Sequence, residues 1–113
     1  MLKGRILATI AAATLVAGPL ALAPAIPAQA ATVVKATQSF SFKPGTVHVN
    51  KGAKVVWKNT CSCTHTVTAT SNNWNKNTTI HSGDTTSFTF KQNGTYKYHC
   101  TIHAGMSGKV VVG

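Results

Sequence analysis

Apolar and polar residues alternate with a period of two along most of the chain after residue 30. The segments Thr46-Val47-His48-Val49 and Ser87-Phe88-Thr89-Phe90 are the clearest cases. A period of two is typical of β-strands with one buried face, and neither a helical stripe nor a heptad repeat accompanies it. The pattern predicts strands near residues 33–42, 46–50, 53–58, 65–70, 84–90, 95–100 and 109–112.

Turn-forming residues separate the predicted strands. They are Pro44-Gly45, Asn50-Lys51-Gly52, Ser82-Gly83-Asp84 and Gln92-Asn93-Gly94. Segment 71–82, rich in Asn and Thr around Trp74, is either a short edge strand or a loop. Strands this short predict an all-β fold, a sandwich of two packed sheets with about seven to eight strands. The large residues available to face inward are Trp57, Phe88, Phe90 and Val111.

The first thirty residues differ in composition from the rest. Lys3 and Arg5 precede an apolar run over residues 6–22, and Ala-Gln-Ala follows at 28–30. This order is that of a secretory signal peptide, and the glycine and prolines that interrupt the run make it a poor membrane span. We predict a signal peptide over 1–30, one mature domain over 31–113, and a secreted, periplasmic or cell-envelope exterior location without stable membrane insertion.

The charge of the chain is strongly positive. The sequence has 11 Lys and Arg residues against one acidic residue, Asp84. Such a surface favours acidic partners, although a charged surface that only keeps the protein soluble is an equally good explanation. Export, the scattered placement of the lysines and the absence of arginine after residue 30 argue against nucleic-acid binding.

The candidate chemistry lies near the C-terminus. Cys100, His103 and Met106 follow one another at intervals of three, so one tight loop can point all three side chains inward. A thiolate, imidazoles and a weak thioether form the ligand set that suits copper in both oxidation states. This set requires a second histidine, and the candidates are His48, His65, His81 and His99.

Position along the predicted strands separates these histidines. His99 adjoins Cys100 and points to the opposite face if the strand continues. His48 alternates with apolar residues and is expected to face solvent, while His81 sits beside a turn. His65 begins a strand after an irregular segment, where a strand could deliver a ligand to one end of the sandwich.

Two stretches of the chain resemble cupredoxins, closest to amicyanin and plastocyanin. The first has Phe42-Lys43-Pro44, Val47, Val49, Gly52, Val55, Trp57 and Asn59, and the second runs over residues 94–112. The short intervals Cys100 to His103 and His103 to Met106 are similar to the ligand loop of amicyanin. The resemblance implies a cupredoxin-like Greek-key β-sandwich with one type I copper ion bound by His65, Cys100, His103 and Met106.

The resemblance also implies what such a site does. Four protein ligands leave no open position for a substrate, so the protein is expected to be an electron carrier and not an enzyme. Electrons are expected to leave through the ring edge of His103. The expected partner is an acidic redox protein that a monomer of this chain binds transiently, by an attraction that salt weakens.

Two features depart from the family. Ile102 stands where the family often has proline, so it keeps an N–H that we predict to donate to the Cys100 sulfur and raise the reduction potential. Cys61 and Cys63 precede His65, where the family gives no reason to expect cysteines. They form either a disulfide, as export favours, or a second Cu(I) site, which would make the protein a copper-binding and delivery protein. A metal-free binding module is a third alternative.

Overall fold

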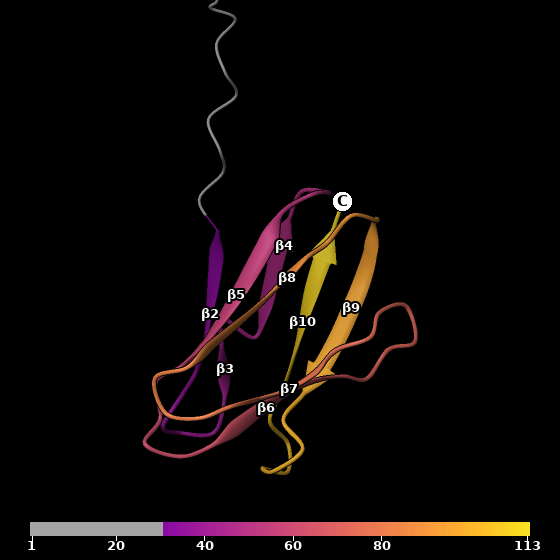
Figure 1. The fold of residues 1–113 in the computed structure, drawn as a ribbon. Helices are drawn as coiled ribbons and strands as arrows, with labels where there is room; N and C mark the ends of the chain where they lie inside the picture. Colours follow the sequence, from indigo (N-terminus) through magenta and orange to yellow (C-terminus); the bar gives the residue numbers. More distant parts are fainter. Residues whose placement is uncertain (1–30) are drawn as a thin grey trace, which may run out of the picture.

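The computed structural model describes residues 31–113, so the predicted signal peptide lies outside the described part of the chain. These residues form nine strands and no helix, and no helix able to cross a membrane is found among them (Figure 1). The strands are β2 (Thr32–Ala36), β3 (Phe42–Lys43), β4 (Thr46–Val49), β5 (Lys54–Asn59), β6 (His65–Ala69), β7 (Asn77–Ile80), β8 (Thr85–Thr89), β9 (Gly94–His99) and β10 (Ser107–Val112).

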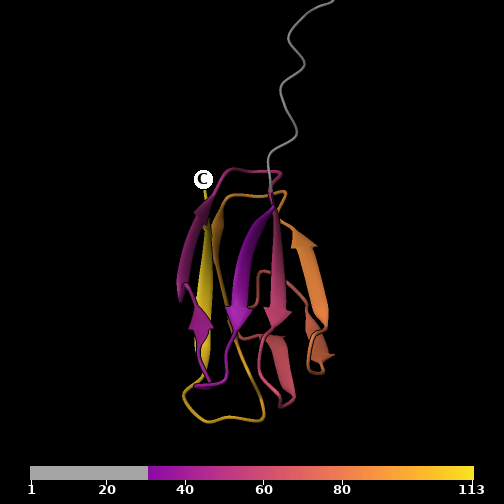
Figure 2. The ribbon, with the colours of Figure 1, turned by 90° about the vertical axis from the view of Figure 1, so that its left-hand side faces the viewer.

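The strands form two sheets that pack face to face. One sheet has the order β4-β10-β9-β6-β7 and the other the order β3-β2-β5-β8 (Figures 1 and 2). Two neighbouring pairs, β4 with β10 and β2 with β5, are parallel, and the other pairs are antiparallel. The predicted all-β sandwich is confirmed.

The strand count exceeds the prediction because of two segments. The predicted strand 33–42 is divided into β2 and β3 by a turn at residues 37–41. In this turn the Thr37 hydroxyl lies 2.8 Å from the Ser41 hydroxyl, and Thr37 N–H donates to the Ser41 carbonyl at 2.9 Å. Such local hydrogen bonds compete with a sheet ladder. The ambiguous segment 71–82 contributes the edge strand β7, which pairs with β6.

The core between the sheets is aromatic and β-branched. Trp57 and Phe90 are fully buried and Phe88 is partly buried, as predicted. Val111 is only half-buried, because its neighbours Val110 and Val112 take the inward positions of β10. The prediction that Val111 faces inward was therefore wrong. Adjacent residues of a strand point to opposite faces, so an error of one position exchanges the inner and the outer face.

Three connections meet at one end of the sandwich. They are the β2–β3 turn at 37–41, the β5–β6 loop at 60–64 and the β9–β10 loop at 100–106 (Figures 1 and 2). The side chain of Gln38 accepts a hydrogen bond from Ser62 N–H at 3.0 Å, which ties the first connection to the second. This end holds every predicted metal ligand.

Candidate metal centre

Three of the four predicted ligands converge on one point. The Nδ1 atoms of His65 and His103 lie 3.2 Å apart, and the Cys100 sulfur lies 3.8 Å from His65 Nδ1 and 3.5 Å from His103 Nδ1. Nitrogen and sulfur atoms bound to one ion at about 2.0–2.3 Å are necessarily about 3–4 Å from one another. The triangle therefore has the size that a single metal ion requires.

The β9–β10 loop brings the backbone of Met106 beside Cys100 and His103. Cys100 N–H donates to the Met106 carbonyl at 2.9 Å, and Met106 N–H donates to the His103 carbonyl at 3.3 Å. These bonds close the loop into a compact ring that begins and ends beside the thiol. Met106 and Cys100 are both buried, which supplies the soft donors that copper favours in a site shielded from water.

A hydrogen bond from Nε2, the ring nitrogen that faces away from the triangle, fixes the orientation of the His65 ring. Its Nε2 lies 3.0 Å from the Thr37 carbonyl oxygen, to which it donates, so Nδ1 carries the free lone pair that faces the triangle. Burial lowers the pKa of His65, and the nearby His103 lowers it further, against the opposing effect of the Thr37 carbonyl. The neutral, metal-binding form of the imidazole is therefore favoured.

The Cys100 sulfur accepts a hydrogen bond from the backbone N–H of Thr66 at 3.3 Å. No hydrogen bond from Ile102 N–H to this sulfur is found among residues 31–113, so the predicted donor is corrected from Ile102 to Thr66. The Thr66 hydroxyl also accepts from Thr101 N–H at 2.8 Å, which fastens the start of the ligand loop to β6. Strand β6 thus supports both His65 and the thiol.

Asn59 organises the loop that leads to His65. Its side-chain amide donates to the carbonyls of Cys63 at 2.8 Å and Ile80 at 2.9 Å, and its side-chain oxygen accepts from Cys61 N–H at 2.8 Å. A buried amide with all these bonds fixes a short loop against the sheet. In the sequence Asn59 stood out only as part of the family resemblance, and its supporting role depends partly on Ile80, which is distant in the chain.

Phe40 covers the face of His103. Their ring centroids are 4.0 Å apart with an interplanar angle of 11°, and Phe40 also meets the His65 ring edge-on at 6.1 Å. Phe40 has φ 57° and is 48% exposed. A bulky residue at positive φ is an outlier that the surrounding turn must maintain. Nothing in the sequence marked this residue, because it lies inside the segment predicted as a strand.

Cys61 and Cys63 are joined in a disulfide, the first of the two alternatives drawn from the sequence. Cys61 is buried, and the Cys63 sulfur lies 3.4 Å from His65 Nε2. Although these two sulfurs and His65 lie close enough to form a second group of donor atoms, the disulfide removes both thiols. Within the described residues Cys100 is the free cysteine.

The other histidines lie apart from the centre. His48 is exposed on β4, His81 is exposed beside a turn, and His99 is half-buried at the end of β9. None of them belongs to a group of potential metal ligands found among residues 31–113.

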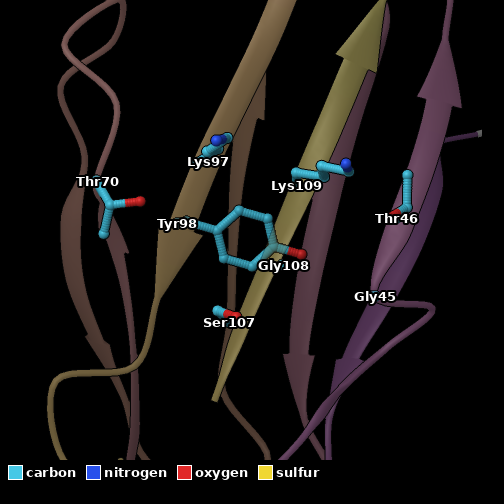
Figure 3. A pocket seen from close by; sticks show the side chains of 8 residues that line it. All are labelled: Gly45, Thr46, Thr70, Lys97, Tyr98, Ser107, Gly108 and Lys109. Atoms are coloured by element: carbon cyan, nitrogen blue, oxygen red, sulfur yellow. The ribbon is translucent and has the colours of Figure 1, made fainter. Parts of the chain in front are cut away.

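A shallow groove of about 390 Å³ lies over β4, β10 and β9. Its lining residues are Gly45, Thr46, Thr70, Lys97, Tyr98, Ser107, Gly108 and Lys109, and the candidate ligands are not among them (Figure 3). The ligand triangle is therefore separate from this surface feature.

The fold and the donor set define a class, the cupredoxins, which hold a single type I copper in a two-sheet sandwich. A search of protein families matches residues 28–113 to the copper binding proteins of the plastocyanin/azurin family. The chain belongs to this family. The residues His65, Cys100, His103 and Met106 fit one type I copper site.

Solved structures agree with this assignment. A Cu(I) form of an amicyanin mutant is 32% identical to this chain, with a TM-score of 0.69. The match covers 76% of this chain and 85% of the amicyanin chain. The reduced Cu(I) form of another amicyanin mutant at pH 4 is 33% identical, with 85% and 92% covered and a TM-score of 0.69. The purple cupredoxin from Nitrosopumilus maritimus, 22% identical over 73% of this chain and 99% of that one with a TM-score of 0.65, supports the fold alone.

Proposed function

We propose that this protein carries single electrons between redox partners, with copper bound by His65, Cys100, His103 and Met106. The observation that carries the proposal is the triangle of His65 Nδ1, His103 Nδ1 and Cys100 Sγ, whose edges are 3.2 to 3.8 Å. With Met106 as the fourth donor, the protein supplies the whole coordination shell. A shell without an open position suits electron transfer and does not suit catalysis on a bound substrate.

Each element of the site has a separate task in this proposal. Bound copper supplies a one-electron couple between Cu(I) and Cu(II). The Thr37 carbonyl and the Thr66 N–H hold His65 and the Cys100 sulfur in fixed positions, so that the ligands need not rearrange when the charge changes. His103, half-buried beside the exposed Phe40, is the ligand closest to solvent and provides the route to a partner.

The setting of the protein forms part of the proposal. Cleavage after Ala30 would release the domain to the periplasm or the cell exterior, where a disulfide between Cys61 and Cys63 is stable. The surplus of lysines suits transient binding of a monomer to an acidic redox protein.

The first test is to add one equivalent of Cu(II) to the protein and record its visible absorption and copper electron spin resonance. We expect an intense blue thiolate-to-copper band that the Cys100→Ser variant lacks. A colourless wild-type protein, or a band that survives in the variant, would refute the proposed site.

The alternative function, copper receipt and delivery through Cys61 and Cys63, requires both thiols to be reduced. The disulfide argues against it. Thiol titration of the unfolded, copper-free protein without reductant decides the matter. One reactive thiol per chain, from Cys100, is expected, and three would restore the delivery alternative.

A further inference from the structure

Three lysines form a single row across the outer face of the four-stranded sheet. Lys35 on β2 pairs directly with Lys43 on β3 and with Lys58 on β5. All three are exposed, whereas their chain neighbours Ala36 and Trp57 are buried, so the three side chains share the outer face. Neighbouring strands of a sheet lie about 4.7–4.9 Å apart, which places three positive charges side by side. We call this set the lysine row.

The lysine row carries three positive charges, and the sequence has one acidic residue, Asp84. Like charges that face each other across a sheet destabilise it. Asp84 precedes Thr85, which pairs with Lys58, so it lies beside one end of the row, and its carboxylate accepts the backbone N–H of His81 at 3.1 Å. One carboxylate cannot balance three lysines, so the row lowers the stability of the free protein and presents a net positive field to solvent.

The lysine row lies at the end of the sheet that carries the metal centre. Strands β2 and β5 end, and β3 begins, where the loop between β9 and β10 lies (Figure 2). Lys35 comes two residues before Thr37, whose carbonyl holds His65, and Lys58 directly precedes Asn59. The same end exposes two large apolar side chains, Phe40, which stacks on His103, and Ile102, which directly precedes His103 in the chain.

We propose that the lysine row is the docking surface for the acidic face of an electron-transfer partner. The positive field of the row attracts and orients the partner at long range. Contact with the exposed side chains of Phe40 and Ile102 then brings the partner close to His103. This inference rests on the proposed electron-carrier function and adds where, and through which charges, the partner binds.

The remaining lysines provide a matched control. Lys97 and Lys109 pair on the other sheet and border the groove seen in Figure 3. Lys51, Lys54 and Lys91 are exposed at or beside the turns of the opposite end, between β4 and β5 and between β8 and β9. A triple change there alters the net charge by the same amount as a triple change in the lysine row.

The test measures electron transfer from the copper-loaded, reduced protein to two small oxidants by stopped flow. Hexacyanoferrate(III) is an anion and tris(phenanthroline)cobalt(III) is a cation, and each takes one electron from Cu(I). The row variant combines Lys35→Gln, Lys43→Gln and Lys58→Gln, and the control variant combines Lys51→Gln, Lys54→Gln and Lys91→Gln. At an ionic strength of about 0.1 M we expect the row variant to react about tenfold more slowly with the anion, the lower end of typical electrostatic steering.

The control variant is expected to change that rate by less than about twofold, because its lysines lie at the opposite end of the strands from His103 and charges are screened over roughly 10 Å at this ionic strength. Neither variant should slow the reaction with the cation. Equal losses in both variants would mean that only net charge matters and would overturn the proposed surface.

A polyglutamate peptide extends the test to an acidic polymer of amino acids. It should inhibit the hexacyanoferrate reaction of the wild-type and control proteins, and inhibit the row variant much less. Equal inhibition of all three proteins would place the acidic contact elsewhere and reject the lysine row. Failure of the proposed function itself looks different, because the wild-type protein would then lack the blue band or would exchange no electron with either oxidant.

Discussion

At the residue scale, the strained turn that carries Phe40 contacts both histidines of the centre. The Thr37 carbonyl accepts from His65, and the Phe40 ring lies flat on His103. A non-glycine residue at positive φ costs of order 1–3 kcal/mol, so the surrounding turn must hold it in place. Hydroxyl contacts among Thr37, Ser39 and Ser41, all within 3.1 Å, supply that support. The backbone conformation thus places an aromatic ring where it limits the movement of a ligand.

Phe40→Ala should therefore loosen His103. Aromatic pairs stabilise by about 0.5–1.5 kcal/mol, so loss of the ring is expected to speed release of copper to a chelator by about two- to tenfold. Water that reaches His103 favours the more highly charged Cu(II) state, so the reduction potential should also fall. Both quantities are measured on the copper-loaded variant, and Phe40→Tyr, which keeps the ring, is expected to behave as wild type. If the alanine and tyrosine variants match each other, the ring does not position His103.

At the element scale, the packing of β9 against β10 depends on a glycine, Gly108. Tyr98 of β9 pairs with Gly108 of β10, and its ring extends across that glycine (Figure 3). The ring is fixed by Phe42 at 4.8 Å and Trp57 at 5.3 Å. Burial raises the pKa of the Tyr98 phenol to about 12, so the ring stays uncharged in the core. A side chain at position 108 has no room.

Gly108→Ala is expected to destabilise the fold for this reason. Its Cβ atom would lie 2.5 Å from the Tyr98 hydroxyl oxygen and 2.6 Å from the ring carbon that bears it. Overpacking of a fixed core typically costs about 1–3 kcal/mol, which urea unfolding of the copper-free protein would measure. Ser107→Ala, an exposed change in the same strand, should stay within about 0.5 kcal/mol of wild type. Equal stability of the glycine and alanine forms at 108 would show that the ring can shift.

At the scale of the whole molecule, the ligand cluster links the folding of the copper-free protein to pH. Burial, and then the neighbouring His103, lower the pKa of His65 below its ordinary value of 6.5. The unfolded chain therefore binds more protons than the folded chain between that lowered pKa and 6.5. The stability that His65 contributes is fully present above pH 6.5 and is lost as the pH falls through its folded pKa.

The melting temperature of the copper-free protein should accordingly fall on acidification from pH 7.5 through this range. His65→Gln removes the titrating group and should flatten that part of the profile. His81→Gln alters an exposed histidine and should leave the profile unchanged. A wild-type profile without this decline, or one that His65→Gln leaves as steep, would contradict the assignment.

The sequence by itself determined most of the strands, the sandwich and the ligand loop, although it missed the turn that divides segment 33–42. Period-two alternation and turn residues depend on neighbours in the chain, and so do the intervals that separate Cys100, His103 and Met106. The same local reasoning favoured His65, because a ligand at the start of a strand can reach one end of a sandwich. It was wrong for Val111, where the register with the neighbouring strand decided which residues face inward.

Only the tertiary structure decided what surrounds the ligands. The N–H donor to Cys100 comes from Thr66, 34 residues away, and not from the adjacent loop residue Ile102. The stacking of Phe40 on His103 and the lysine row likewise join residues from separate strands or loops. Such contacts depend on sheet register and on the way connections meet at one end of the sandwich, which local patterns of hydrophobicity do not encode.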